Sequence, residues 1–137
     1  EGLGEVEGIN VEKLLKTINL DFITLSLYPT YLVSTIKEGV LFDIPQLEIL
    51  ETLFDTHYPD TNFVIIADRK FDYTINPTCY MEVSKYEKLK GIAVVCYNDA
   101  SEKIAHFEEK FYKKPFQVYR NLKSAEVWAE GILADSN

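Results

Sequence analysis

The chain has 137 residues, of which 47% are hydrophobic and 13% aromatic, so it can form the core of one ordinary domain and is not a disordered polypeptide. Its 22 acidic and 14 basic residues give a formal net charge of −8, which argues against nucleic-acid binding and against docking on anionic membranes. The two cysteines, Cys79 and Cys96, are too few for a disulfide framework, and we expect reduced, buried thiols in a cytoplasmic protein.

The N-terminal residues are rich in glycine and glutamate. We therefore expect residues 1–10 to be a mobile tail and residues 11–137 to form a single α/β domain. Every apolar run is shorter than the roughly 20 residues of a membrane helix, so we expect no membrane insertion. The segment Val11–Ile18 is ambiguous, because its apolar residues suit a helical turn but could equally begin an edge strand.

Two alternating segments come next. Leu20–Tyr28 places polar and apolar side chains in turn, and this period of two indicates a strand with one buried face. Tyr31–Lys37 resumes the alternation after a turn at Pro29 and Thr30. Together the two segments predict an antiparallel β-hairpin.

A helix is predicted to begin near Asp43. Asp43 and Gln46 match a capping box, although Pro45 as the first helical residue would make Ile44 the cap. The helix would bury an apolar stripe made of Leu47, Leu50 and Phe54.

Two short apolar runs, Phe63–Ala67 and Ile92–Tyr97, predict strands that are buried on both faces, as in a parallel sheet covered by helices. Between them we expect a polar loop over Asp68–Ile75 and a helix over about Asn76–Lys88. Gly91 is expected to break the chain before the second run.

The C-terminal third predicts two more helices around a short strand. Asp99–Glu102 matches a capping box, and the helix after it would turn an apolar stripe inward, namely Ile104, Phe107 and Phe111. Pro115–Tyr119 indicates a strand. Asn121 would cap the last helix, whose inward stripe is Ala125, Trp128, Ala129 and Ile132. Strands that alternate with about four helices predict an α/β fold with a mixed, mainly parallel sheet and an N-terminal β-hairpin.

At this point the chain resembles the SpoIIAA-like STAS family, and in particular its small stand-alone bacterial proteins of unassigned function. The resemblance covers roughly residues 20–133, in the order and spacing of several stretches: Ile36–Val40, Phe63–Arg69, Asn76-Pro77, Ala93–Val95, Pro115–Tyr119 and Ala125–Trp128. It implies a SpoIIAA-like fold and a protein-interaction domain.

In the anti-sigma factor antagonists of that family, a serine or threonine at the start of the helix after the third strand is phosphorylated. The corresponding stretch here is Ala67–Thr78, which lacks the family's Asp-Ser-Ser-Gly-type motif. Its nearest hydroxyl groups are those of Thr74 and Thr78, which the resemblance makes candidate phosphorylation sites.

The segment Asp68–Thr78 is a candidate binding site on physical grounds as well. It connects the carboxyl end of a buried strand to a helix N-terminus, and both positions favour ligands, the second one anions. The candidate binding residues are Asp68, Arg69, Tyr73, Thr74, Asn76 and Thr78. The alternative is a well-capped surface loop in which Asp68 and Arg69 form local salt bridges.

Catalytic and metal signatures do not stand out. His57 and His106 lack the spacing of metal ligands, and no serine or cysteine lies in a nucleophile-elbow pattern. We therefore expect no catalytic residues, no metal and no cofactor. Cys79, near an expected helix N-terminus, is either a structural thiol or one with a lowered pKa.

Three functions follow from these observations. The first is a non-enzymatic interaction or regulatory domain that binds another protein or itself, as a homodimer. The second is a binder of a small molecule, an anion or a lipid through the loop 68–78. An enzyme is the third, and it would need a general base with a perturbed pKa in a pocket.

Overall fold

The computed structural model describes residues 13–136, so the expected tail at residues 1–10 lies outside the described part. A six-stranded sheet has the order β1-β2-β3-β5-β7-β8. Its strands are β1 (Lys16–Asn19), β2 (Ile23–Leu27), β3 (Tyr31–Ile36), β5 (Phe63–Asp68), β7 (Leu89–Val95) and β8 (Phe116–Tyr119). The helices among the described residues are α2 (Ile44–His57), α3 (Thr78–Val83), α4 (Asp99–Glu109) and α5 (Leu122–Ser136).

The sheet is mixed, as the alternation of strands and helices predicted. Strands β1, β2 and β3 pair antiparallel, and β3, β5, β7 and β8 pair parallel. The predicted hairpin is confirmed, with Leu25 opposite Ser34 and Ser26 opposite Val33. The ambiguous segment before it forms the edge strand β1 from Lys16 onward.

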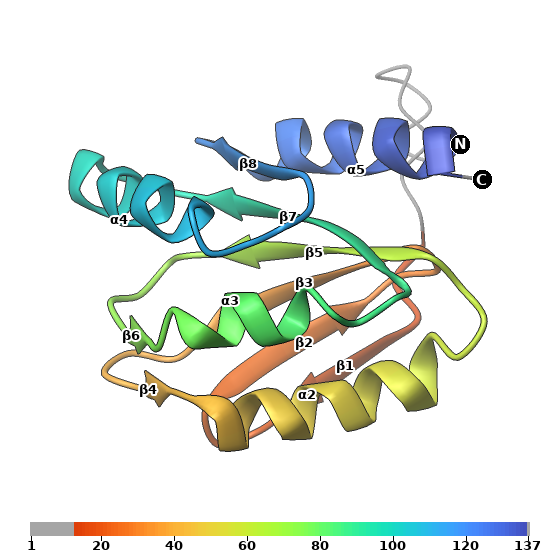
Figure 1. Cartoon of the computed structure of the whole chain (residues 1–137), viewed down its shortest axis with the longest axis horizontal. Helices are drawn as coiled ribbons and strands as arrows, with labels where there is room; N and C mark the ends of the chain where they lie inside the picture. The colour runs from red at the N-terminus through yellow and green to blue at the C-terminus, as the bar shows by residue number, and fades with distance from the viewer. Residues whose placement is uncertain (1–12, 137) are drawn as a thin grey trace.

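Helices cover the sheet on both sides (Figure 1). On one face, α2, α3 and the inner side of α4 enclose the larger core, which includes Leu50, Phe54 and Phe63. On the other face, α5 packs against β5, β7 and β8, where Ala125 and Ala129 are fully buried. The small alanine side chains allow α5 to lie close to the sheet.

The start of α2 confirms the predicted capping box. The backbone N–H of Ile44 donates to Asp43 Oδ1 at 2.7 Å, and the backbone N–H of Asp43 donates to Gln46 Oε1 at 2.9 Å. Asp43 is therefore the cap, and Pro45 occupies the second helical position, where its missing N–H leaves no hydrogen bond unmade.

Three predicted boundaries are wrong. The helix expected over Asn76–Lys88 comprises only Thr78–Val83, and its C-cap Ser84 donates its hydroxyl to the Tyr80 carbonyl and accepts from the Lys113 N–H. Strand β7 begins at Leu89, so Gly91 lies inside it instead of before it. Helix α4 is capped by Asn98, whose side chain accepts from the Ser101 N–H at 2.8 Å, and not by the expected box at Asp99–Glu102.

A second, two-stranded sheet was not predicted at all. Strands β4 (Leu41–Phe42) and β6 (Thr74–Ile75) pair parallel, and β6 lies inside the segment expected to be an irregular loop. The Asn76 N–H donates to the Phe42 carbonyl at 2.9 Å and extends this ladder by one residue. The small sheet fixes the chain between the end of β5 and the start of α3.

Candidate functional site

The predicted binding segment begins with two buried charged residues at the carboxyl end of β5. Asp68 accepts a hydrogen bond of 2.5 Å from the Tyr97 hydroxyl, and Lys70 Nζ lies 3.6 Å from its other oxygen. Arg69 follows directly and is also buried. Both side chains are engaged inside the protein, and the partner of Arg69 is the sequence-distant Glu108.

Arg69 is the centre of a polar cluster that we name the Arg69 cluster, comprising the buried residues Arg69, Tyr80 and Glu108 and the partly buried Tyr73. Arg69 Nη2 lies 2.7 Å from Glu108 Oε1, and Arg69 Nε donates to the Tyr73 hydroxyl at 2.9 Å. The Tyr80 hydroxyl donates to the same Glu108 oxygen at 2.9 Å. The cluster therefore joins the loop after β5 to both α3 and α4.

The electrostatics of the Arg69 cluster keep its hydroxyl groups protonated. Burial, reinforced by the charge of Glu108, raises the pKa of Tyr80 well above its usual value. Burial also raises the pKa of Tyr73, although the neighbouring Arg69 opposes part of that rise. The single oxygen Glu108 Oε1 is shared between the Arg69 guanidinium and the Tyr80 hydroxyl.

The remaining predicted site residues lie along β6 and the start of α3. Asn76 links two helix starts, because its Nδ2 donates to Asp43 Oδ1 at 2.9 Å and its Oδ1 accepts from the Thr78 N–H at 3.0 Å. The hydrogen bonds that Asp43 accepts from Asn76 Nδ2 and from the Ile44 N–H lower the pKa of its carboxyl group. Thr74 and Thr78 are exposed, so the two candidate phosphorylation sites are accessible.

Cys79, directly after Thr78, is a buried thiol. Burial, together with the charges of Asp43 and Glu51, raises its pKa from an ordinary value of 9.0 to about 11. The alternative of a lowered pKa at a helix N-terminus is therefore wrong, because desolvation outweighs the short helix α3.

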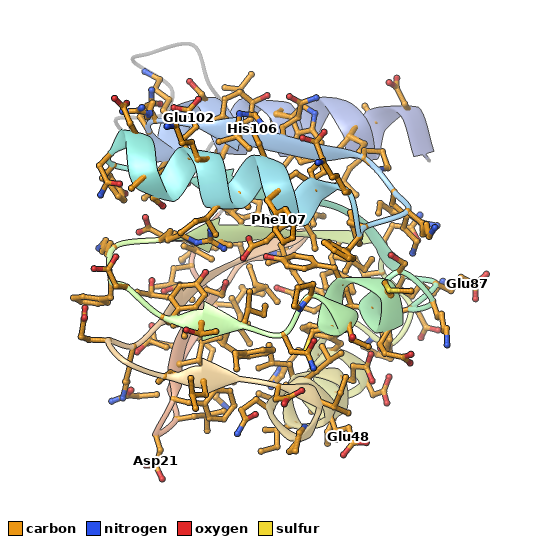
Figure 2. The ribbon with its side chains drawn as sticks, turned by 60° about the vertical axis from the view of Figure 1, so that its left-hand side comes forward. Asp21, Glu48, Glu87, Glu102, His106 and Phe107 are labelled. Atoms are coloured by element: carbon orange, nitrogen blue, oxygen red, sulfur yellow. The ribbon has the colours of Figure 1, made fainter. Side chains whose placement is uncertain are left out.

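Helix α4 contradicts the predicted inward stripe. Ile104 and Phe107 are each 52% exposed, whereas Ala105 is fully buried and Glu108 is 4% exposed. Figure 2 shows Phe107 on the flank of α4 that faces α3 and β6, and Glu102 and His106 on the opposite flank. The helix thus turns a charged residue inward and its large apolar residues outward.

We use the name α4 stripe for the exposed apolar residues of α4, Ala100, Ile104 and Phe107, together with the partly buried Phe111 two residues after the helix. Their spacing of three and four residues places them in one line along the helix. The rings of Phe107 and Phe111 pack edge to face, with centroids 5.3 Å apart. Ile104 and Phe107 are therefore two large apolar side chains that lie together on the exposed side of α4.

Sequence reasoning did not identify Glu108 and Tyr80 as site residues. One signal was present, since Arg69 directly follows a buried strand and therefore needs an acidic partner. Several carboxylates could have supplied it, and only the three-dimensional arrangement selects Glu108 of α4.

An apolar cavity of about 70 Å³ lies between the sheet and helices α2 and α3. Its walls include Ile36, Phe42 and Leu50, and the side chains of Tyr73 and Tyr80 line it next to the Arg69 cluster. Ligand sites commonly have volumes of roughly 300–1,000 Å³, so this cavity suits a molecule of only a few heavy atoms.

The described residues contain neither a metal-binding cluster nor a membrane-spanning helix. Within residues 13–136, no three histidine, cysteine, aspartate or glutamate side chains come together as a metal site would require. In the same part of the chain, no helix combines the length and apolar character needed to cross a membrane.

Comparison with known proteins identifies the fold. No family model matches the sequence, and no curated protein matches it significantly. Among solved structures, the chain is similar to an uncharacterized protein of the DUF3478 family with a SpoIIAA-like fold from Shewanella loihica PV-4. The TM-score is 0.54 at 12% sequence identity, over 88% of this chain and 96% of that chain. The chain described here therefore has a SpoIIAA-like α/β fold, as the resemblance in its sequence implied.

Proposed function

We propose that this chain is a non-enzymatic protein-interaction domain whose partner docks on helix α4. The observation that carries the proposal is the exposure of Ile104 and Phe107, each about half accessible, on a helix that buries Glu108 instead. Apolar side chains held outward lose the stabilisation that burial would give, so their placement makes most sense if a partner covers them.

Two further observations support an interaction role. The buried carboxylates of Asp68 and Glu108 are both used in internal hydrogen bonds, which favours a structural function for them over catalysis. The SpoIIAA-like fold is compatible with a regulatory interaction domain in the cytoplasm, although a fold alone does not define function.

The experiment is an affinity capture from the source cell with three baits. These are the wild-type chain, the variant Ile104→Ser/Phe107→Ser, and the variant Ile49→Ser. Ile49 is a matched control, since it is an exposed isoleucine on α2, on a different surface. We expect the wild type and Ile49→Ser to retain the same partner and the α4 variant to lose it. Identical captures by all three baits, or none, would contradict the proposal.

Light scattering on purified protein decides whether the partner is a second copy of the chain. If the α4 stripe forms a homodimer, the wild type has twice the mass of the Ile104→Ser/Phe107→Ser variant. A monomeric wild type directs the search to another protein. Intact-mass measurement of protein from the native host tests phosphorylation at Thr74 or Thr78, which would add a regulatory charge next to α3.

The cavity supports a second candidate, the binding of a small apolar molecule near the loop 68–78. Because Arg69 is paired with Glu108, an anion would have to displace that carboxylate, and an apolar molecule is the better match. A thermal-shift assay with benzene, hexanoate and inorganic phosphate tests this candidate. Stabilisation by benzene that the cavity-filling variant Cys79→Leu abolishes would support it, and the absence of any shift would remove it.

A further inference from the structure

The α4 stripe has a basic border. Lys103 of α4 and its C-cap residue Lys110 are exposed, and the ammonium group of Lys110 is 5.9 Å from the centroid of the Phe107 ring. Together with Lys113, these two lysines form no ion pair with any carboxylate among residues 13–136. Uncompensated ammonium groups next to exposed apolar rings are therefore a built-in feature of this surface.

The basic border continues beyond the helix. The Lys113 N–H donates to Ser84 Oγ, and Lys114 Nζ donates to the carbonyls of Tyr86 and Leu89 at 2.6 and 2.7 Å. Burial and the nearby charge of Lys90 lower the pKa of Lys114. The segment after α4 thus lies against the connection between α3 and β7.

Apart from the buried Glu108, the acidic residues of α4 lie on the opposite flank, where they contact Arg120 or His106. Arg120 Nη2 is 2.6 Å from Asp99 and 2.6 Å from Glu102, and His106 lies 3.6 Å from Glu102 and 3.5 Å from Glu109. Glu108 is buried against Arg69. In a chain with a net charge of −8, the α4 stripe is therefore bordered by positive charge on its open side.

This distribution of charge discriminates between occupants. A two-fold contact between two copies would place the same lysine-bordered surface on both sides, so that like charges would meet. An anionic membrane would attract the lysines but repel the strongly acidic remainder of the chain. A partner segment with apolar residues and carboxylates complements both the apolar stripe and the lysines beside it.

Within α4 the stripe runs from Ala100 to Phe107 for about 10 Å, at about 1.5 Å per residue, which matches two turns of a second helix. We propose that the α4 stripe and its lysine border bind an acidic amphipathic helix of another protein. This inference rests on the proposed interaction function and adds the chemical nature of the partner.

The probe is a displayed library of random 16-residue peptides, selected against the full chain. We expect the enriched peptides to carry a net negative charge and apolar residues at helical spacing. Their affinity for the chain, measured by fluorescence anisotropy, should fall by at least about tenfold in the charge-reversed variant Lys110→Glu/Lys113→Glu. The matched control Lys13→Glu/Lys16→Glu changes the net charge equally, at the start of the remote strand β1 and in the residues before it, and should bind within about twofold of wild type.

Other outcomes overturn the inference. Enriched peptides without acidic residues, equal losses in both charge-reversed variants, or no enrichment at all contradict an acidic partner. Sedimentation of the chain with vesicles of phosphatidylcholine and phosphatidylserine would assign the surface to a membrane instead. Neutral peptides that still lose affinity on Phe107→Ser would refute the acidic partner but leave the proposed interaction function standing, whereas binding indifferent to Phe107→Ser would contradict both.

Discussion

Glu108 of α4 and Arg69 of the segment after β5 face each other across 2.7 Å in the interior of the protein, and both side chains are almost completely buried. Because opposite faces of one helix cannot both point inward, this ion pair fixes the rotation of α4. The rotation places Ala105 and Tyr112 in the core and leaves Ile104 and Phe107 outside. The buried pair and the exposed stripe are therefore two consequences of one arrangement.

Glu108→Gln should destabilise the protein strongly. The substitution keeps the shape of the side chain but leaves the Arg69 guanidinium buried without a counter-charge, which costs about 3–5 kcal/mol in comparable cases. Urea unfolding followed by circular dichroism measures the difference. The control Glu109→Gln changes the exposed neighbour and should stay within about 0.5 kcal/mol of wild type. Equal stabilities for the two variants would show that the ion pair contributes little.

Ile104→Ser and Phe107→Ser should leave the fold intact, since both side chains are half exposed. We expect each variant to lose less than about 1 kcal/mol in urea unfolding, because exposed positions contribute little to stability. Leu50→Ala in the core is the comparison and should lose about 2–5 kcal/mol. If Ile104→Ser or Phe107→Ser lost as much stability as Leu50→Ala, these residues would pack inward and α4 would be rotated from the orientation described.

Local patterns in the sequence predicted the central architecture well. The unbroken apolar runs identified β5 and β7, and period-two alternation identified the hairpin of β2 and β3. The capping residue Asn121 was also correct, with the Ser124 N–H donating to its Oδ1 at 2.9 Å, and of the two caps considered for α2 the structure selects Asp43. These signals are local, so they can be interpreted without knowledge of the tertiary contacts.

The orientation of α4 could not be predicted in this way. Ile104, Phe107 and Phe111 form a regular apolar stripe, and hydrophobicity alone turns such a stripe inward. The inward face is instead determined by Arg69, which is distant in sequence and requires Glu108. The strands β4 and β6 escaped prediction for a related reason, because two residues carry no periodicity and only their pairing defines them.

The thiol of Cys79 should be unreactive in the folded protein. Its pKa is raised from 9.0 to about 11, so the folded state is favoured while the thiol stays neutral. This contribution to the free energy of unfolding is fully present below pH 9 and is lost as the pH rises through 11. At pH 8, we expect iodoacetamide to alkylate neither Cys79 nor Cys96 until urea is added, as followed by mass spectrometry. The control Thr78→Cys places a thiol at the exposed neighbouring position and should react quickly. Rapid alkylation of native Cys79 would contradict its burial.

Gly91→Ala should destabilise the packing of α5 on β7. A Cβ atom at Gly91 would lie 2.9 Å from Trp128 Cη2 and 3.2 Å from the Pro115 carbonyl oxygen, so the indole and the backbone around it must move. Such overpacking typically costs about 1–3 kcal/mol. Thermal and urea unfolding should both show the loss.

Gly131 provides a control in which substitution by alanine should change the stability in the opposite direction. Gly131 lies within α5, and no atom comes within 4 Å of the position where its Cβ would stand. Gly131→Ala should therefore stabilise the protein by up to about 1 kcal/mol, because alanine favours the helical conformation over glycine. If both substitutions stabilised the protein, Trp128 would not lie against Gly91, and the seating of α5 on the sheet would have to be revised. If both destabilised it, the surroundings of Gly131 would be more crowded than described.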